Sequence, residues 1–137
     1  MEWDIKLGGN FDVMVPANLR RLLAACATAS WVHLGTPCPS FSTARRGKIG
    51  SPGGPMRSLQ FPWGVSGLSD IDQAKVAAGN AFAKITLRIV RFCRARGIGV
   101  SVENPLRSQL WRLPPVQRLF ASVEKVDLDY CGYGTPW

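Results

Sequence analysis

The stretch WVHLGTPCPS, residues 31–40, decides the fold, because a mostly apolar run stops there at a glycine and a cysteine follows between two prolines. Its first four residues have the composition of a short buried β-strand, which Gly35 would end. A second run of this kind, GVSVEN at 99–104, stops at Pro105. A basic loop and a long helical pattern separate the two runs. The sequence therefore predicts two strands joined through a helix.

Two segments carry the spacing of amphipathic helices. Residues 16–27 begin with a proline, which suits a first helical turn, and their apolar side chains recur every three or four positions (Leu19, Leu22, Leu23 and Cys26). A longer helix is expected from Ser69 or Asp70, where a side chain can cap it, to about Arg96, before Gly97. We expect its apolar stripe at Ala78, Phe82, Ile85, Ile89 and Cys93, with Lys84, Arg88 and Arg91 almost opposite.

Towards the C-terminus we expect a helical turn or two over 106–113, broken at Pro114, and a half-exposed third strand over 123–130. Strands that alternate with helices imply one α/β domain over residues 1–137, with a mostly parallel sheet and right-handed crossovers. Ligands of such sheets bind beyond the carboxyl ends of the strands. That rule brings the segments after residues 34, 102 and 130 to one edge, which we call the rim.

The charge of the chain is high and uneven. The formal net charge is +8, and residues 43–120 hold thirteen Lys and Arg against three acids. Residues 43–67 form a Gly-rich and Pro-rich basic loop of unusual length for a small domain, which favours a functional role. A basic middle suggests a polyanionic partner, nucleic acid first, although a solvated surface is the plainer alternative. We expect no membrane span, no signal peptide and an intracellular location, nuclear or cytoplasmic.

The chain has four cysteines, one histidine and no C-x-x-C pair, so we expect no metal site. Cys26 and Cys93 lie on apolar helix faces and are expected to be buried. Cys38, by contrast, follows a strand end, and Glu103 ends the neighbouring strand. A thiol and a carboxylate at one rim permit nucleophilic chemistry with an acid partner. A thiol enzyme that pairs Cys38 with His33 is disfavoured, because two side chains five positions apart on a strand start on opposite faces of the sheet.

The segments TPCPSFSTAR and VSVENP resemble the Pro-Cys and Glu-Asn motifs of the DNA (cytosine-5)-methyltransferase family. The family's Phe-Ser step after the cysteine is matched by Phe41 and Ser42, and EWD at 2–4 is similar to its cofactor motif. The resemblance covers most of residues 2–105. It implies a Rossmann-like class I methyltransferase sandwich. The family's Gly-rich cofactor loop precedes the position of Glu2, so the fold is expected to be incomplete at the N-terminus.

The resemblance also implies roles for individual residues. The thiolate of Cys38 would add to cytosine C6, while Glu103 and Asn104 would complete the catalytic group. S-adenosylmethionine would be the cofactor, bound by Glu2, Trp3, Asp12 and Pro37. Phosphate contacts would come from the basic loop and its start, at Ser42, Arg45, Arg46, Lys48 and Arg57. DNA is the first expected substrate and RNA the second. The alternative is a catalytically degenerate nucleic-acid-binding module, and a further chain or segment could complete either fold.

Overall fold

The structure is a computed structural model that describes residues 2–45, 47–49, 51 and 53–128. Two short 3-10 helices, η1 (Ile5–Leu7) and η2 (Gly9–Phe11), come first. They are followed by α1 (Pro16–Cys26), β1 (Trp31–Gly35), α2 (Asp70–Arg94) and β2 (Gly99–Glu103). The 3-10 helix η3 (Gln109–Arg112) and the helix α3 (Pro114–Phe120) complete the order. The architecture is mixed α/β, as expected. No helix of this described part is long and apolar enough to cross a membrane.

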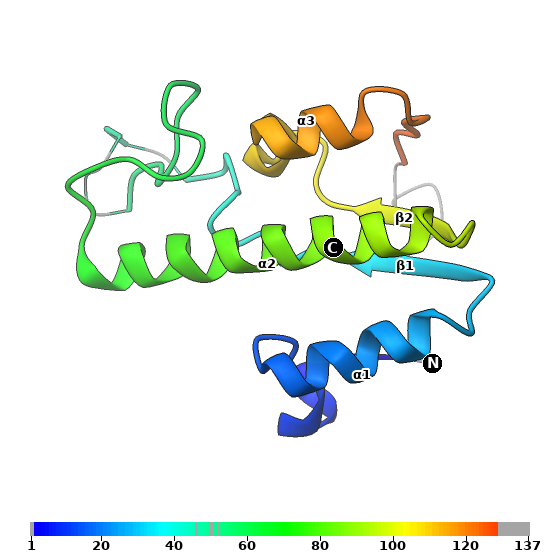
Figure 1. Ribbon diagram of the computed structural model, residues 1–137. Helices are drawn as coiled ribbons and strands as arrows, with labels where there is room; N and C mark the ends of the chain where they lie inside the picture. Colours follow the sequence, from blue (N-terminus) through cyan, green and yellow to red (C-terminus); the bar gives the residue numbers. More distant parts are fainter. Residues whose placement is uncertain (1, 46, 50, 52, 129–137) are drawn as a thin grey trace.

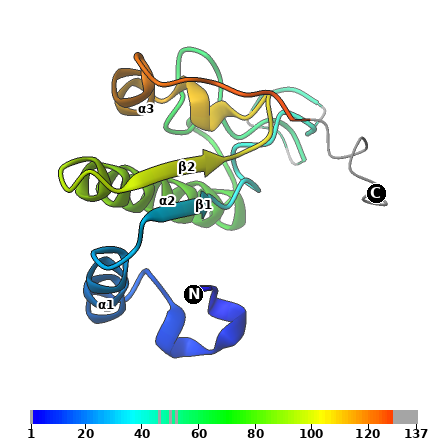
Figure 2. The same ribbon diagram turned by 90° about the vertical axis from the view of Figure 1, so that its right-hand side faces the viewer.

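The two strands pair in parallel, with Trp31 opposite Gly99 and Gly35 opposite Glu103. Both predicted strands and their parallel direction are therefore confirmed, but β1 is not buried as expected, because its residues alternate between exposed and half-buried. Figures 1 and 2 show α2 running alongside the pair, with α3 on one side of the helix and α1 on the other. The basic loop lies beyond the carboxyl ends of the strands, next to the first turns of α2 (Figure 1).

The ends of α2 follow from local chemistry. The Ser69 side chain accepts a hydrogen bond from the Asp72 backbone N–H at 3.3 Å, which caps the first turn as predicted. At the other end, Gly97 has a φ of 68°, a left-handed conformation that glycine adopts without strain. A helix of 25 residues results, far longer than the five-residue strands that it accompanies.

The hydrophobic core forms two clusters on either side of α2. One joins α2 to η3 and α3, through Phe41, Ala83, Leu87, Leu110, Leu113 and Val116. The other joins α2 to α1 and the sheet, through Leu19, Leu23, Cys26, Ile89 and Cys93, with Val32, Leu34 and Val100 packed against it. Because α2 has neighbours on two sides, its buried surface is wider than one stripe. The predicted stripe is correct at Ile89 and Cys93 and wrong at Ala78, which is exposed.

Of the expectations for the C-terminal part, one is confirmed and one is wrong. The expected helical turn is present as η3 and ends before Pro114, but Pro114 also begins α3, which was not expected. A proline at the first helical position gives up only an N–H that has no partner there. Residues 123–128 form no strand, and residues 129 and 130 lie outside the described part. An alternating pattern stabilises a strand only where a neighbouring strand can pair with it. Here Val126 and Leu128 stay exposed, and Lys125 pairs with Asp127 at 3.1 Å.

Candidate functional site at the strand rim

The carboxyl ends of β1 and β2 bring the Pro-Cys and Glu-Asn segments together. The register places Gly35 beside Glu103, so Cys38 and Glu103 leave adjacent strands at one rim. The Asn104 side-chain amide donates a hydrogen bond to the Thr36 carbonyl, which ties the two segments to each other. The Thr36 hydroxyl is in turn 2.8 Å from that of Thr86, so α2 holds the start of the Pro-Cys segment. The expected meeting of these two motifs is confirmed.

Cys38 begins a tight turn that is anchored at its far end. The Phe41 N–H donates to the Cys38 carbonyl at 2.8 Å, which closes the turn over residues 38–41. Phe41 is fully buried, and its own carbonyl accepts from the Gln109 N–H at 2.9 Å. The Cys38 residue itself is half-buried. The turn therefore has a fixed end in the core and a partly accessible thiol-bearing residue at its start.

Glu103 lies on the sheet face opposite to the core. A Cβ built on Gly35 would stand 3.8 Å from the Glu103 carboxylate, so this side chain lies over the end of β1. On the same face, Nδ1 of His33 is 2.9 Å from the Ser101 hydroxyl, and the Trp31 indole donates to that hydroxyl at 3.1 Å. His33 therefore has a serine partner, Ser101, which lies two residues before Glu103 on the same sheet face.

Arg57 was expected to contact phosphate, but the structure places it inside the protein. The residue is 2% exposed, and all five of its N–H groups donate to protein oxygens. Its acceptors are the carbonyls of Ser40, Pro62 and Val76, the Ser40 hydroxyl and the Asn80 side chain. The guanidinium also stacks 3.9 Å above the Phe41 ring. Burial lowers the pKa of Arg57 to about 10, so it stays charged at neutral pH. Arg57 holds the Cys38 turn rather than a ligand phosphate.

The other residues expected to contact phosphate differ in how far they are already engaged within the protein. Arg45 makes two hydrogen bonds of 3.1 Å to the Asp72 carboxylate, so its charge is partly matched inside the protein. Those bonds, with a smaller contribution from Lys75, hold the pKa of the Asp72 carboxyl below its ordinary value. Lys48 is exposed, whereas Ser42 is half-buried and accepts from the Ala44 N–H. Arg46 lies outside the described residues.

The residues expected at the cofactor make the following contacts within the protein. Trp3 packs edge-on against Phe11 at 5.1 Å, and the Arg21 guanidinium lies 5.6 Å from the centre of its ring. Its buried indole N–H has no hydrogen-bond partner among the described residues. The Asp12 carboxylate accepts from the Met14 N–H, and Glu2 is exposed with no strand around it. Pro37, at the rim, is exposed.

Sequence reasoning missed the residue on η3 that adjoins this site. Gln109 binds the Phe41 carbonyl through its backbone and turns its side chain towards the basic loop. A glutamine in a short helical turn carries no pattern that would single it out. Comparison with protein families, with characterised proteins and with solved structures finds no match to this chain.

Proposed function

We propose that this chain is a catalytic segment of the cytosine-C5 methyltransferase type, with a Rossmann-like class I fold. It would act on cytosine in DNA, with S-adenosylmethionine as the methyl donor. The observation that carries the proposal is that the Pro-Cys segment leaves β1 beside Glu103, the last residue of the paired parallel strand. The methyl donor is inferred from the resemblance alone.

The two rim residues suit thiolate addition to a pyrimidine. Cytosine C6 is a weak electrophile, and a soft thiolate on Cys38 forms a bond to it as electron density moves towards C5 and N3. A carboxyl group on Glu103 stabilises that density through a hydrogen bond at N3. Asn104 positions the group, since its amide donates to the carbonyl of Thr36, two residues before Cys38. The prolines on both sides of Cys38 restrict the backbone and so limit the positions of its sulfur.

Exchange of the hydrogen at C5 tests this chemistry without a methyl donor. Once the thiolate is bound at C6, C5 takes a proton from water. It then loses its original hydrogen as the carbon–sulfur bond breaks. We expect an oligodeoxynucleotide with deuterium at cytosine C5 to lose the label in the presence of the chain. Cys38→Ser should slow the loss by more than about 100-fold, and Glu103→Gln by a similar factor.

The matched control is Glu124→Gln, which removes an exposed carboxylate far along the chain from the rim. It should exchange like the unaltered protein, and circular dichroism should show that all variants are folded. Label loss that persists in Cys38→Ser would exclude Cys38 as the nucleophile. An oligonucleotide that binds the unaltered chain without any label loss would exclude the thiolate mechanism.

The second candidate is a nucleic-acid-binding module that has lost catalysis. It is favoured by the basic surface, where Lys48, Lys84, Arg88 and Arg91 are exposed, together with the packed state of Trp3. Binding without exchange at C5 would be the result that this candidate expects.

A further inference from the structure

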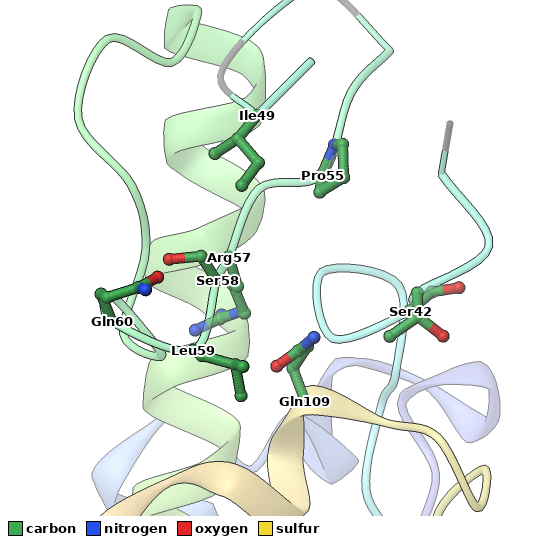
Figure 3. A pocket seen from close by; sticks show the side chains of 9 residues that line it. Ser42, Ile49, Pro55, Arg57, Ser58, Leu59, Gln60 and Gln109 are labelled. Atoms are coloured by element: carbon green, nitrogen blue, oxygen red, sulfur yellow. The ribbon is translucent and has the colours of Figure 1, made fainter. Parts of the chain in front are cut away.

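A cavity of about 300 Å³ lies between the basic loop and η3, beside the end of the Cys38 turn. Figure 3 shows Gln109 facing it from η3, Leu59 at its side, and Ile49 and Pro55 on the loop across from Gln109. Ser42 lines it where the Cys38 turn ends. The volume lies at the lower end of the range of small-molecule sites, which suits one small planar ligand.

The mouth of this cavity is apolar. Ile49 is 58% exposed and Leu59 is 68% exposed, although both are large hydrophobic side chains. Exposed apolar side chains at a hollow give a flat ligand two surfaces to pack against, and burial of that surface stabilises the complex. The ligand that fits best is therefore planar and has apolar faces.

The edge of the cavity offers an unused hydrogen-bond acceptor. The Gln109 Oε1 atom is buried and has no hydrogen-bond partner among the described residues. An acceptor in this state has lost its water without gaining a partner, and a ligand N–H can supply that partner after a small rotation of the side chain. A ligand with an amine at its edge is thus favoured.

The positive charge at the cavity does not favour a phosphate. Arg57 lines the cavity, but its five N–H groups already donate to protein oxygens. No carboxylate among the described residues forms an ion pair with it either, so the charge is held by neutral oxygens alone. A phosphate would need free N–H donors. A neutral ring that carries an amine does not need such donors.

We propose that this cavity binds a nucleobase, namely one that flanks the base at Cys38. The identity of the flanking base rests on the proposed function. Ser42 follows Cys38 by four residues, which span at most about 14 Å even when extended, so both positions can contact one short strand. The apolar mouth packs against the faces of the base, and Gln109 accepts from its exocyclic amine.

Titration with free nucleosides tests the cavity directly. The full chain with Cys38→Ser, which excludes covalent chemistry, is titrated with deoxyadenosine and deoxycytidine while side-chain amide resonances are followed by NMR. We expect saturable shifts of the Gln109 amide. Gln109→Met should weaken binding roughly three- to tenfold, because it keeps the length of the side chain and removes the acceptor. The free Gln109→Met chain should melt no lower than its parent, since the lost acceptor had no partner.

The matched control is Gln73→Met, on the exposed face of α2, which should bind like the parent chain. Inorganic phosphate should leave the Gln109 amide unshifted. The absence of a saturable nucleoside shift, equal affinity in Gln109→Met, or a phosphate shift at Gln109 would each overturn the proposal. Loss of C5 exchange tests the rim chemistry separately, so failure of one proposal is distinguishable from failure of the other.

Discussion

At the scale of single residues, the described thiols occupy two environments. Cys26 and Cys93 face each other between α1 and α2, and burial raises the pKa of both thiols. For Cys26, the neighbouring Cys93 raises the pKa further. Cys38, in the rim turn, is half-buried instead. Because the thiolate is the reactive form, exposure and pKa together set which cysteine reacts first.

We therefore predict selective modification at Cys38. At neutral pH, iodoacetamide should alkylate Cys38 at least about ten times faster than Cys26 or Cys93, since a raised pKa and burial both lower the accessible thiolate fraction. Peptide mass spectrometry after short reaction times measures each rate. Equal rates at Cys26 and Cys38 would show that the cluster between α1 and α2 opens readily or that the rim turn is closed.

Sequence patterns foresaw these buried thiols but not the role of Arg57. A helical spacing of three and four places Cys26 and Cys93 on apolar faces, and the core followed that spacing. Arg57 stands in a loop rich in glycine, where charge suggested a ligand contact. Its actual acceptors belong to Ser40, Pro62, Val76 and Asn80, which come from separate segments. Contacts of that kind arise from the folded chain and leave no local pattern.

At the scale of elements, α2 is shaped by one glycine. Gly79 lies in the buried part of the helix, and a Cβ there would meet the Ser40 hydroxyl at 2.1 Å and Arg57 Nη2 at 3.0 Å. The absence of a side chain lets the Cys38 turn and the Arg57 guanidinium approach the helix backbone. A helix interior normally disfavours glycine by about 1 kcal/mol relative to alanine. Here close packing outweighs that cost.

Gly79→Ala should therefore destabilise the fold by about 1–3 kcal/mol, in spite of the better helix propensity of alanine. Urea unfolding followed by circular dichroism measures the change. Ala78→Ser, at the exposed neighbouring position, should stay within about 0.5 kcal/mol of the parent. A Gly79→Ala chain more stable than its parent would mean that the Cys38 turn is not packed against α2 as described.

The contact between the basic loop and α2 gives a prediction about pH. Arg45 and Lys75 hold the pKa of the Asp72 carboxyl below the ordinary aspartate value of 3.8. The stabilisation is thus fully present above that value and is lost as the pH falls through the lower pKa of the folded state. Asp72→Asn should lower the melting temperature at pH 7, and the difference from the parent should shrink below pH 3.8.

Asp70→Asn, on the same first helical turn but exposed, is the control and should have a smaller effect at pH 7. Equal melting temperatures for the Asp70→Asn and Asp72→Asn chains across this range would show that the Arg45 pair does not hold the loop.

Elements were predictable where their ends depend on nearby residues. Ser69 caps α2 by bonding three residues ahead, and the turn at Gly97 needs only its own backbone freedom. The third expected strand failed because strand formation needs a partner that local alternation does not reveal. The helix at Pro114 was missed since a proline ends one helix and begins another with equal ease.

At the scale of the whole molecule, charge is distributed along α2 rather than at the rim alone. Lys84, Arg88 and Arg91 are exposed on one face of the helix, at spacings of four and three residues. Like charges at these spacings repel, which destabilises a helix by a few tenths of a kcal/mol per pair. The first and last are about 10 Å apart along the axis. A polyanion that lies along this face would remove the repulsion.

We predict that single-stranded DNA binds with strong salt dependence and that this face of α2 contributes to it. The double variant Arg88→Gln and Arg91→Gln should lower the slope of log affinity against log salt by about 1.4, or roughly 0.7 for each lost phosphate contact. Fluorescence anisotropy at several salt concentrations measures the slope. Lys6→Gln combined with Arg20→Gln makes the same charge change at exposed positions on η1 and α1 and should leave the slope unchanged. Equal losses in the two double variants would mean that net charge alone governs binding. An unchanged slope in Arg88→Gln and Arg91→Gln would remove α2 from the nucleic-acid surface and leave the basic loop as its remaining candidate.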